Sequence, residues 1–161
     1  MVAVLMVCTG NICRSPSAEA VLRHHVAAAG LADRITVDSA GTQDYHRGEP
    51  PSRLAVDCAE ARGYDLSPLR ARQVQREDFL RFDLILAMDR GHLGRLSAMN
   101  PATRSGKIRL FMDFAPDDPR ADASGEVPDP YYGDRQDYEH SLDLIESAIP
   151  GLIATLRRDY L

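Results

Sequence analysis

Residues 1–17 read MVAVLMVCTGNICRSPS, and this stretch decides the fold. Residues 1–7 are apolar without alternation, as expected of a strand that is covered on both faces of a parallel sheet. Ser15 can cap a helix that has Pro16 at its first position, and Gly30 can end that helix. The stretch therefore predicts a buried strand, a tight loop and a helix.

The rest of the chain repeats this alternation of strands and helices. Further strands are predicted at residues 35–37, 84–88 and 108–111, and further helices at 52–63, 79–82, 89–100 and 134–161. Asn100-Pro101 should end one helix, and Pro150 should kink the last. Right-handed crossovers then give a Rossmann-like α/β fold, a four-stranded parallel sheet with helices on both faces. A ligand crevice is expected at the carboxyl ends of its strands. We expect one domain, 1–161.

Composition and charge exclude several classes of protein. With 44% hydrophobic and 27% charged residues, the chain does not resemble disordered, collagenous or disulfide-stapled proteins. Its 19 Lys and Arg against 24 Asp and Glu give a net charge of −5, so no global positive field attracts nucleic acid or a membrane surface. The longest apolar run, residues 1–8, is far shorter than the roughly 20 residues of a membrane span. We see neither a basic leader nor a small-residue cleavage site, so the sequence does not indicate export. Its three cysteines, an odd number, indicate reduced thiols and a cytoplasmic protein.

The loop between the first strand and the first helix carries residues suited to chemistry. Cys8 and Arg14 bracket five residues, a geometry that turns successive backbone N–H groups inward as an anion nest. The helix N-terminus and the Arg14 guanidinium both favour the thiolate of Cys8, which makes it a candidate nucleophile. Arg14 also offers a planar fork for two phosphoryl oxygens. Taken alone, Cys8 can instead be a small apolar residue that ends a strand.

The longer segment 8–20, CTGNICRSPSAEA, closely resembles the signature of the low molecular weight protein tyrosine phosphatases. Four further segments resemble the family in the same order: DSAGT at 38–42, ARQ at 71–73, FDLILAMD at 82–89 and VPDPYYG at 127–133. The resemblance implies the phosphotyrosine phosphatase I fold and metal-independent hydrolysis of phosphotyrosine and aryl phosphate monoesters through a cysteinyl-phosphate. It implies no cofactor and no metal, a phosphotyrosine protein or small aryl phosphate as substrate, and phosphate as product and competitive inhibitor.

The resemblance also implies roles for particular residues. Cys8 and Arg14 are implied to be catalytic, and Asp129 of the Asp-Pro motif is implied to be the general acid and later the base. On the residues alone, Asp129 between two prolines is equally consistent with a solvated loop carboxylate. The residues implied to bind the phosphate group follow Cys8: Thr9, Gly10, Asn11, Ile12, Cys13 and Ser15.

Several loop residues have a second interpretation. Ser15 resembles the family serine that hydrogen-bonds the thiolate, although it can also be simply a helix cap. Asn11 matches the family asparagine whose side chain and tolerance for left-handed backbone hold the turn open. Cys13 is either a packing residue or, as the resemblance implies, the partner in a reversible disulfide with Cys8 under peroxide. Cys58 is expected in the core.

Aromatic residues are candidates for the walls of a substrate pocket. Tyr45, Tyr131 and Tyr132 can line a deep slot that admits a flat phenyl phosphate, or they can be half-buried loop residues with their hydroxyls in water. Ile12 favours a tyrosine phosphatase, because the protein-arginine phosphatase branch of the family resembles this motif but carries Thr at that position.

One position departs from the family pattern. Two residues before the ARQ motif the family often has a His that steadies the loop asparagine, and here Leu69 stands in its place. Since Leu cannot hydrogen-bond, Asn11 needs another partner, for which Ser39 is the candidate. Asp89 is expected either to orient Arg14 through a charge-assisted bond or to cap a helix.

Other functions on this fold, or at these residues, fit less well. Besides a protein-arginine phosphatase, a thioredoxin-linked arsenate reductase is an alternative, but it needs later cysteines and none follows Cys58. A phosphocarrier of sugar transport would not need Arg14 and Asp129, because it must not hydrolyse its adduct. A zinc site lacks a second ligand pair at suitable spacing. Three histidines have no motif around them and are expected at the surface: His46, His92 and His140.

Overall fold

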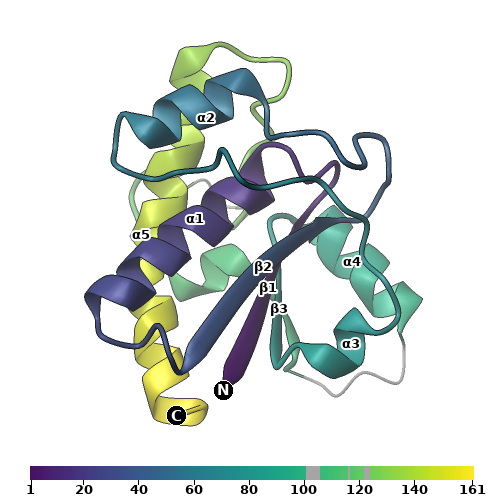
Figure 1. The fold of residues 1–161 in the computed structure, drawn as a ribbon, viewed down its shortest axis with the longest axis vertical. Coiled ribbons are helices and arrows are strands. Elements are labelled where there is room, and N and C mark those ends of the chain that lie inside the picture. The colour runs from purple at the N-terminus through teal and green to yellow at the C-terminus, as the bar shows by residue number, and fades with distance from the viewer. Residues whose placement is uncertain (101–105, 116, 122–123) are drawn as a thin grey trace.

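A computed structural model describes residues 1–100, 106–115, 117–121 and 124–161. Within them, four strands form one parallel sheet in the order β2-β1-β3-β4 (Figure 1). The strands are β1 (Val2–Cys8), β2 (Ile35–Gly41), β3 (Leu84–Ala87) and β4 (Ile108–Leu110). The four-stranded parallel sheet expected from the sequence is confirmed.

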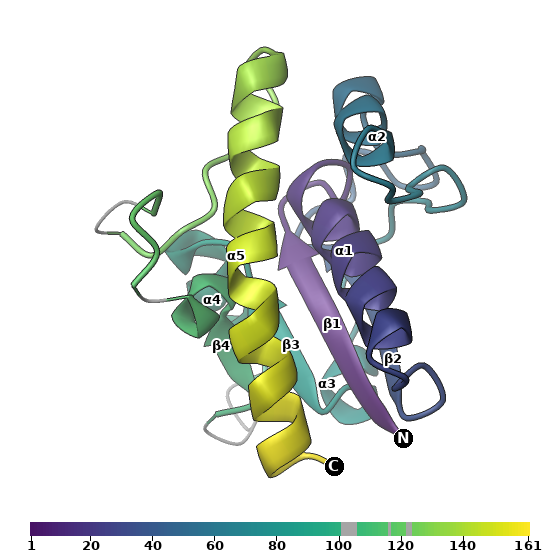
Figure 2. The same ribbon diagram turned by 90° about the vertical axis from the view of Figure 1, so that its left-hand side faces the viewer.

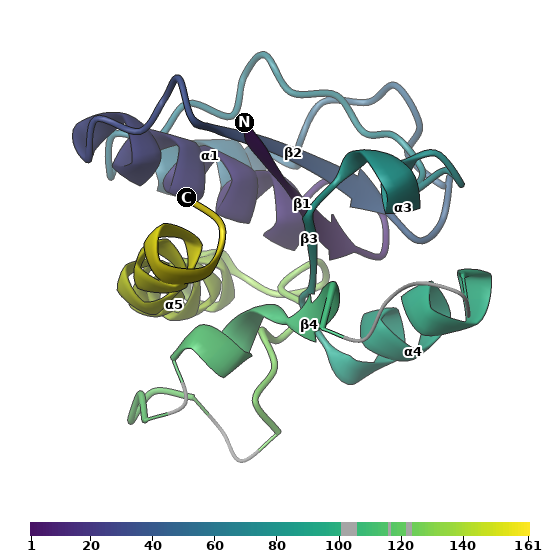
Figure 3. The same ribbon diagram turned by 90° about the horizontal axis from the view of Figure 1, so that it is seen from below.

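The helices cover both faces of the sheet, as predicted. They are α1 (Arg14–Ala28), α2 (Arg53–Glu60), α3 (Asp78–Arg81), α4 (Arg90–Met99) and α5 (Arg135–Asp159), with a short 3₁₀ helix at Phe111–Phe114. Figure 2 shows α1 and α5 in front of β1, and Figure 3 shows α3 and α4 on the other side of the sheet.

The apolar residues of β1 belong to two hydrophobic clusters, one on each face of the sheet. Val4 and Met6 pack into the larger cluster with α1, α2 and α5, whereas Leu5 and Val7 pack into the smaller cluster with α3 and α4. Successive side chains of a strand point to opposite faces, so a strand covered on both faces needs an apolar residue at every position. The central place of β1 follows from this sequence.

Several predicted boundaries were wrong. β2 continues past residue 37 to Gly41, in register with β1. The sequence did not indicate this because Asp38 and Ser39 are polar, but Arg72 and Glu19 satisfy their side chains. β3 ends one residue before the predicted 88, and β4 ends one residue before the predicted 111, where the 3₁₀ helix begins.

The helix limits also differ from the predictions. Ser52 caps α2 rather than belonging to it, and α2 ends at Glu60, short of the predicted residue 63. α4 ends at Met99, near the predicted stop, while Pro101 lies outside the described residues. α5 begins after a capping box at Asp134 and continues as a helix through Pro150. Among the described residues, no helix is long and apolar enough to cross a membrane.

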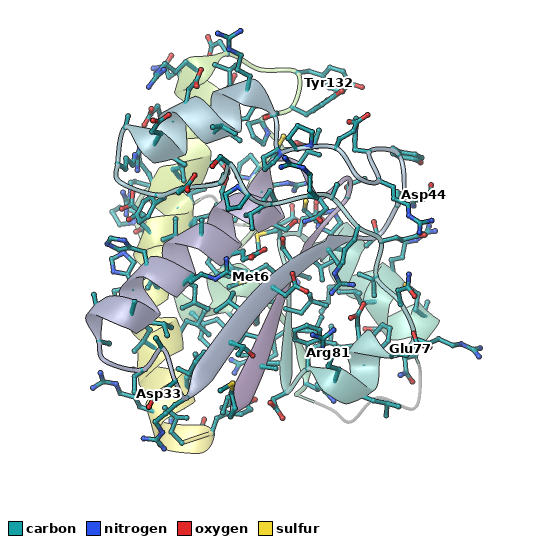
Figure 4. The ribbon with its side chains drawn as sticks, in the orientation of Figure 1. Met6, Asp33, Asp44, Glu77, Arg81 and Tyr132 are labelled. Carbon is teal, nitrogen blue, oxygen red and sulfur yellow. The ribbon has the colours of Figure 1, made fainter. Side chains whose placement is uncertain are left out.

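Loops from distant parts of the chain gather where β1 and β2 end. Figure 4 shows Asp44, in the loop after β2, and Tyr132, in the loop before α5, towards the same end of the molecule. Cys8 is the last residue of β1 and pairs with Gly41, the last residue of β2. The crevice expected at the carboxyl ends of the strands is therefore built by these loops.

Candidate active site

Residues 8–14, here called the cysteine loop, join β1 to α1. The backbone carbonyls of Cys8, Thr9, Ile12 and Cys13 point outward and accept hydrogen bonds from neighbouring segments or from the first turn of α1. The backbone N–H groups of residues 9–13 donate no hydrogen bond to any described residue. A loop with its acceptors satisfied and its donors free is the arrangement expected of an anion nest.

Asn11 holds the turn of the cysteine loop in shape. It has a φ of 59°, in the left-handed region that Asn tolerates better than most residues. Its Nδ2 donates to Ser39 Oγ at 2.9 Å and to Ser15 Oγ at 2.8 Å, and its Oδ1 accepts from the backbone N of Arg72 at 3.0 Å. Ser39 is a hydrogen-bond partner of Asn11, as predicted, and the backbone N–H of Arg72 supplies a further bond.

The interpretation of Ser15 as a helix cap was wrong. α1 begins at Arg14, so Ser15 lies within its first turn, and Pro16 follows at the third position. Pro is tolerated there because the first N–H groups of a helix have no acceptor in the preceding turn. The hydroxyl of Ser15 instead lies 2.9 Å from Cys8 Sγ and 2.8 Å from Asn11 Nδ2.

The Arg14 guanidinium is buried and fixed on two sides. Its Nη1 donates to Asp89 Oδ2 and to the carbonyl of Val127, both at 3.0 Å, and its Nη2 lies 3.5 Å from Asp129 Oδ2. Asp89 also caps α4 by accepting from the backbone N of His92 at 2.9 Å, so both expectations for Asp89 are met. Burial raises the pKa of Asp89, but the His92 N–H and the Arg14 guanidinium outweigh it and hold that pKa below its usual value.

A pocket of about 280 Å³ lies over the cysteine loop. Cys8 is 3% exposed and lies at its floor, while Asp129, with a half-exposed side chain, belongs to its wall. The rings of Tyr131 and Tyr132 lie 4.7 Å apart at 80°. The lining residues are Cys8, Thr9, Gly10, Ile12, Cys13, Arg14, Tyr45, His46, Asp129, Tyr131 and Tyr132.

The structure therefore separates the predicted residues into two groups. The predicted catalytic residues, the three tyrosines and four residues of the cysteine loop (Thr9, Gly10, Ile12 and Cys13) line the pocket. The other four predicted residues lie outside the lining and form hydrogen bonds with lining residues or with one another: Asn11, Ser15, Ser39 and Asp89.

Comparison with known proteins identifies the family of this chain. The profile of the low molecular weight phosphotyrosine protein phosphatases matches residues 3–160. The chain belongs to this family. A low molecular weight protein-tyrosine-phosphatase of Streptomyces coelicolor is 45% identical over 157 residues, covering 96% of this chain and 93% of that protein. Protein-tyrosine phosphatase A of Mycobacterium tuberculosis is 41% identical over 150 residues, covering 92% of this chain and 88% of that protein.

Solved structures of the family have the same fold. The protein tyrosine phosphatase of Entamoeba histolytica, crystallised with Hepes in its active site, has a TM-score of 0.92 and 35% identity, with complete coverage of both chains. A drosophila arginine phosphatase also shares the fold, with a TM-score of 0.87, 28% identity and coverage of 97% and 98%. By family, this low molecular weight phosphatase is an enzyme of the hydrolase class and a protein-tyrosine-phosphatase.

One histidine of this phosphatase, His92, is buried, contrary to the prediction, and a second, His46, is partly exposed at the pocket. His92 is 4% exposed, and its Nε2 lies 2.8 Å from Thr9 Oγ1. Burial and the nearby Arg14 lower the pKa of His92 to about 4. His46 lines the pocket with its Nδ1 2.7 Å from Glu49 Oε2. The spacing of His92 from the cap at Asp89, one helical turn, was the signal that could have placed it, and only His140 is exposed as predicted.

The other two cysteines are buried, as Cys8 is. Cys13 Sγ lies 3.5 Å from Ser52 Oγ and from the Tyr138 hydroxyl, and burial raises the pKa of its thiol. Cys58 is fully buried, as predicted. The packing interpretation of Cys13 agrees with these contacts, and sequence reasoning missed Tyr138, which brings α5 against the cysteine loop.

No cluster of three or more His, Cys, Asp or Glu in the described parts of the chain is arranged to hold a metal ion.

Proposed function

We propose that this chain, acting as a single domain of residues 1–161, hydrolyses phosphotyrosine and small aryl phosphate monoesters without a metal, through a cysteinyl-phosphate on Cys8. One observation supports this most strongly. Cys8 Sγ lies at the floor of a pocket that it shares with free backbone N–H groups, the Arg14 guanidinium and the Asp129 carboxyl. These are a nucleophile, a phosphate-binding loop and a general acid.

The first step transfers the phosphoryl group to sulfur. The Cys8 thiolate attacks phosphorus, so that an S–P bond forms while the P–O bond to the leaving group breaks. Asp129 donates its proton to the departing phenolate oxygen. The N–H groups of residues 9–13 and the fork of Arg14 hold the non-bridging oxygens, whose charge grows along the reaction path. Asp89 and Val127 occupy Nη1, which fixes the orientation of the guanidinium.

The second step releases phosphate. Asp129, now a carboxylate, takes a proton from a water molecule that attacks phosphorus, and the S–P bond breaks. The Ser15 hydroxyl, 2.9 Å from Cys8 Sγ, can donate to the sulfur as it leaves as thiolate. Phosphate is the product and, because it fits the same nest, a competitive inhibitor.

The pocket wall supports an aryl substrate. Ile12 is apolar and lies in the lining beside Tyr45, Tyr131 and Tyr132, so a phenyl ring finds aromatic and aliphatic surface there. The free thiols of Cys8, Cys13 and Cys58 support a cytoplasmic location, where such thiols stay reduced.

The test compares phosphotyrosine, phosphoarginine and phosphoserine peptides as substrates, in EDTA, for the wild type, Cys8→Ser and Asp129→Ala. We expect turnover of phosphotyrosine alone, none in Cys8→Ser, and a loss in Asp129→Ala of about 10²- to 10⁴-fold for poor leaving groups. Preference for phosphoarginine, turnover by Cys8→Ser, or loss of activity in EDTA contradicts the proposal.

A further inference from the structure

The first turn of α4 contacts both loops of the site. Asp89, at its cap, pairs with Arg14. The backbone N of Arg90 donates to Glu126 Oε2 at 2.7 Å, and His92 Nε2 lies 2.8 Å from Thr9 Oγ1. One helical turn therefore holds both ends of the cysteine loop and the start of the segment that carries Asp129. We call that segment, residues 126–133, the aspartate loop.

The direction of the hydrogen bond between His92 and Thr9 depends on which nitrogen of the ring carries the proton. His92 Nδ1 lies 3.2 Å from Asp89 Oδ1, without a well-aligned hydrogen bond. A carboxylate can only accept, so the ring proton is favoured on Nδ1, and Nε2 then accepts the proton of the Thr9 hydroxyl. The charged groups that face the ring are Asp89, Arg14, Asp129 and Glu126, and burial beside Arg14 keeps the ring neutral above about pH 4. In this tautomer the ring accepts a hydrogen bond from Thr9, the first residue after Cys8.

Glu126 attaches the start of the aspartate loop to the first turn of α4 through the backbone N–H of Arg90. The N–H of Arg90 is one of the first N–H groups of a helix, which have no acceptor within the helix and favour a carboxylate. Val127, the next residue, is fully buried, with its N–H on the carbonyl of Met88 at 2.9 Å and its carbonyl on Arg14. Asp129 follows two residues later, with a half-exposed side chain. Its distance from Cys8 therefore depends on the anchored residues before it.

We propose that His92 and Glu126 are positioning residues, which attach the cysteine loop and the aspartate loop to the same turn of α4. His92 acts through Thr9 on the phosphate-binding nest, and Glu126 acts through Val127 on the general acid. The inference rests on the proposed function. It requires two distinct kinetic signatures, because one residue serves phosphate binding and the other serves proton transfer.

The first experiment tests His92 through phosphate binding. His92→Phe removes the acceptor while keeping a ring, and Thr9→Val removes the donor with little change of shape. Each is expected to raise the inhibition constant of inorganic phosphate by about tenfold, the worth of one well-placed hydrogen bond. The double variant is expected to be no worse than either single one, since both break the same bond. His92→Gln, whose amide oxygen can accept from Thr9, is expected to restore part of the affinity.

Two results overturn the role of His92. One is wild-type phosphate affinity in a folded His92→Phe protein. The other is additive losses in the double variant, which mean that the two side chains act separately. If His92→Phe does not fold, Thr9→Val with wild-type phosphate affinity overturns it as well.

The second experiment tests Glu126 through the leaving group. Phenyl phosphate needs a proton donor more than p-nitrophenyl phosphate does, because phenolate is the more basic leaving group. Glu126→Ala is expected to lower kcat/KM for phenyl phosphate several-fold more than for p-nitrophenyl phosphate, and Glu126→Gln, which still accepts from Arg90, is expected to resemble the wild type. Glu77→Ala is the matched control: its carboxylate has no side-chain hydrogen bond at the start of α3, and Figure 4 shows it far from Tyr132.

Combining Glu126→Ala with Asp129→Ala tests the role of Glu126 separately from the proposed role of Asp129. There, Glu126→Ala is expected to add no further leaving-group effect, because no acid is left to position. Equal losses on both substrates in Glu126→Ala, with a leaving-group effect in Asp129→Ala, overturn the role of Glu126 alone. Absence of a leaving-group effect in Asp129→Ala itself overturns the proposed role of Asp129.

Discussion

The cysteine loop and the aspartate loop face the same pocket, but they are built in opposite ways. In the cysteine loop Cys8, Asn11 and Arg14 are each at most 3% exposed, and buried polar partners fix their side chains. In the aspartate loop Tyr132 is 96% exposed, and Asp129 keeps half of its side chain in solvent. The rigid half suits an invariant phosphate group. The open half suits leaving groups that differ in size, and it lets the Asp129 carboxyl exchange protons with water.

Among the changes that compare the two loops, the largest effect is expected from Arg14→Lys, because Arg14 contacts both of them. Lys cannot donate to Asp89 and Val127 while also presenting a fork to phosphate. We expect kcat/KM for p-nitrophenyl phosphate to fall on the order of a thousandfold, the scale of losing an oxyanion donor. Steady-state kinetics measures this, with a thermal unfolding midpoint as the control for folding. A loss below tenfold would mean that the fork is not needed.

A smaller effect, mainly on stability, is expected from Ser39→Ala behind the cysteine loop. The change removes an acceptor from Asn11 and a donor from Glu19, both of which are buried. Leaving buried polar groups without partners costs about 1–3 kcal/mol of unfolding free energy. Urea denaturation measures this loss. Asp44→Ala, on the exposed loop after β2, is the control and should leave the midpoint unchanged.

The same buried network predicts a dependence of stability on pH. Burial raises the pKa of Glu19 above its ordinary 4.5, although Ser39 and Arg23 partly oppose it. The folded state therefore favours protonated Glu19, and the contribution of this group to stability falls as the pH rises from 4.5 through the raised value. Glu19→Gln should remove this fall, so its unfolding free energy relative to wild type should increase between pH 4 and pH 8. A constant difference between the two proteins across that range contradicts the prediction.

The smallest effect is expected from Tyr132→Ala at the rim of the aspartate loop. Because the ring is almost fully exposed, its removal should leave the unfolding midpoint unchanged. Loss of an aromatic contact should raise KM for an aryl phosphate about two- to tenfold with little change in kcat. Phosphotyrosine kinetics measures both. A large fall in kcat would place Tyr132 in the chemistry rather than at the entrance.

The sequence predicted the local features of the cysteine loop better than the contacts that its side chains make. The apolar run of β1, the Asn11 turn and the spacing from Cys8 to Arg14 are local, so the strand, loop and helix followed from short-range rules. The same rules misplaced Ser15 as a cap, since the hydroxyl bonds Cys8 and Asn11 once the loop curls back. They also missed His92, whose partner Thr9 lies on a different strand-to-helix connection.

By itself the sequence determined which residues could do chemistry, and the order in which the strands and helices carry them. Chain connectivity fixes Cys8 beside Arg14, because five residues between a strand and a helix leave little conformational choice. Only the tertiary structure decided that Asp129, Tyr45 and His92 meet at that loop. Their distance from Cys8 depends on parallel strands ending at one edge of the sheet and on the anchoring of the aspartate loop to α4, which are contacts between segments far apart in the chain.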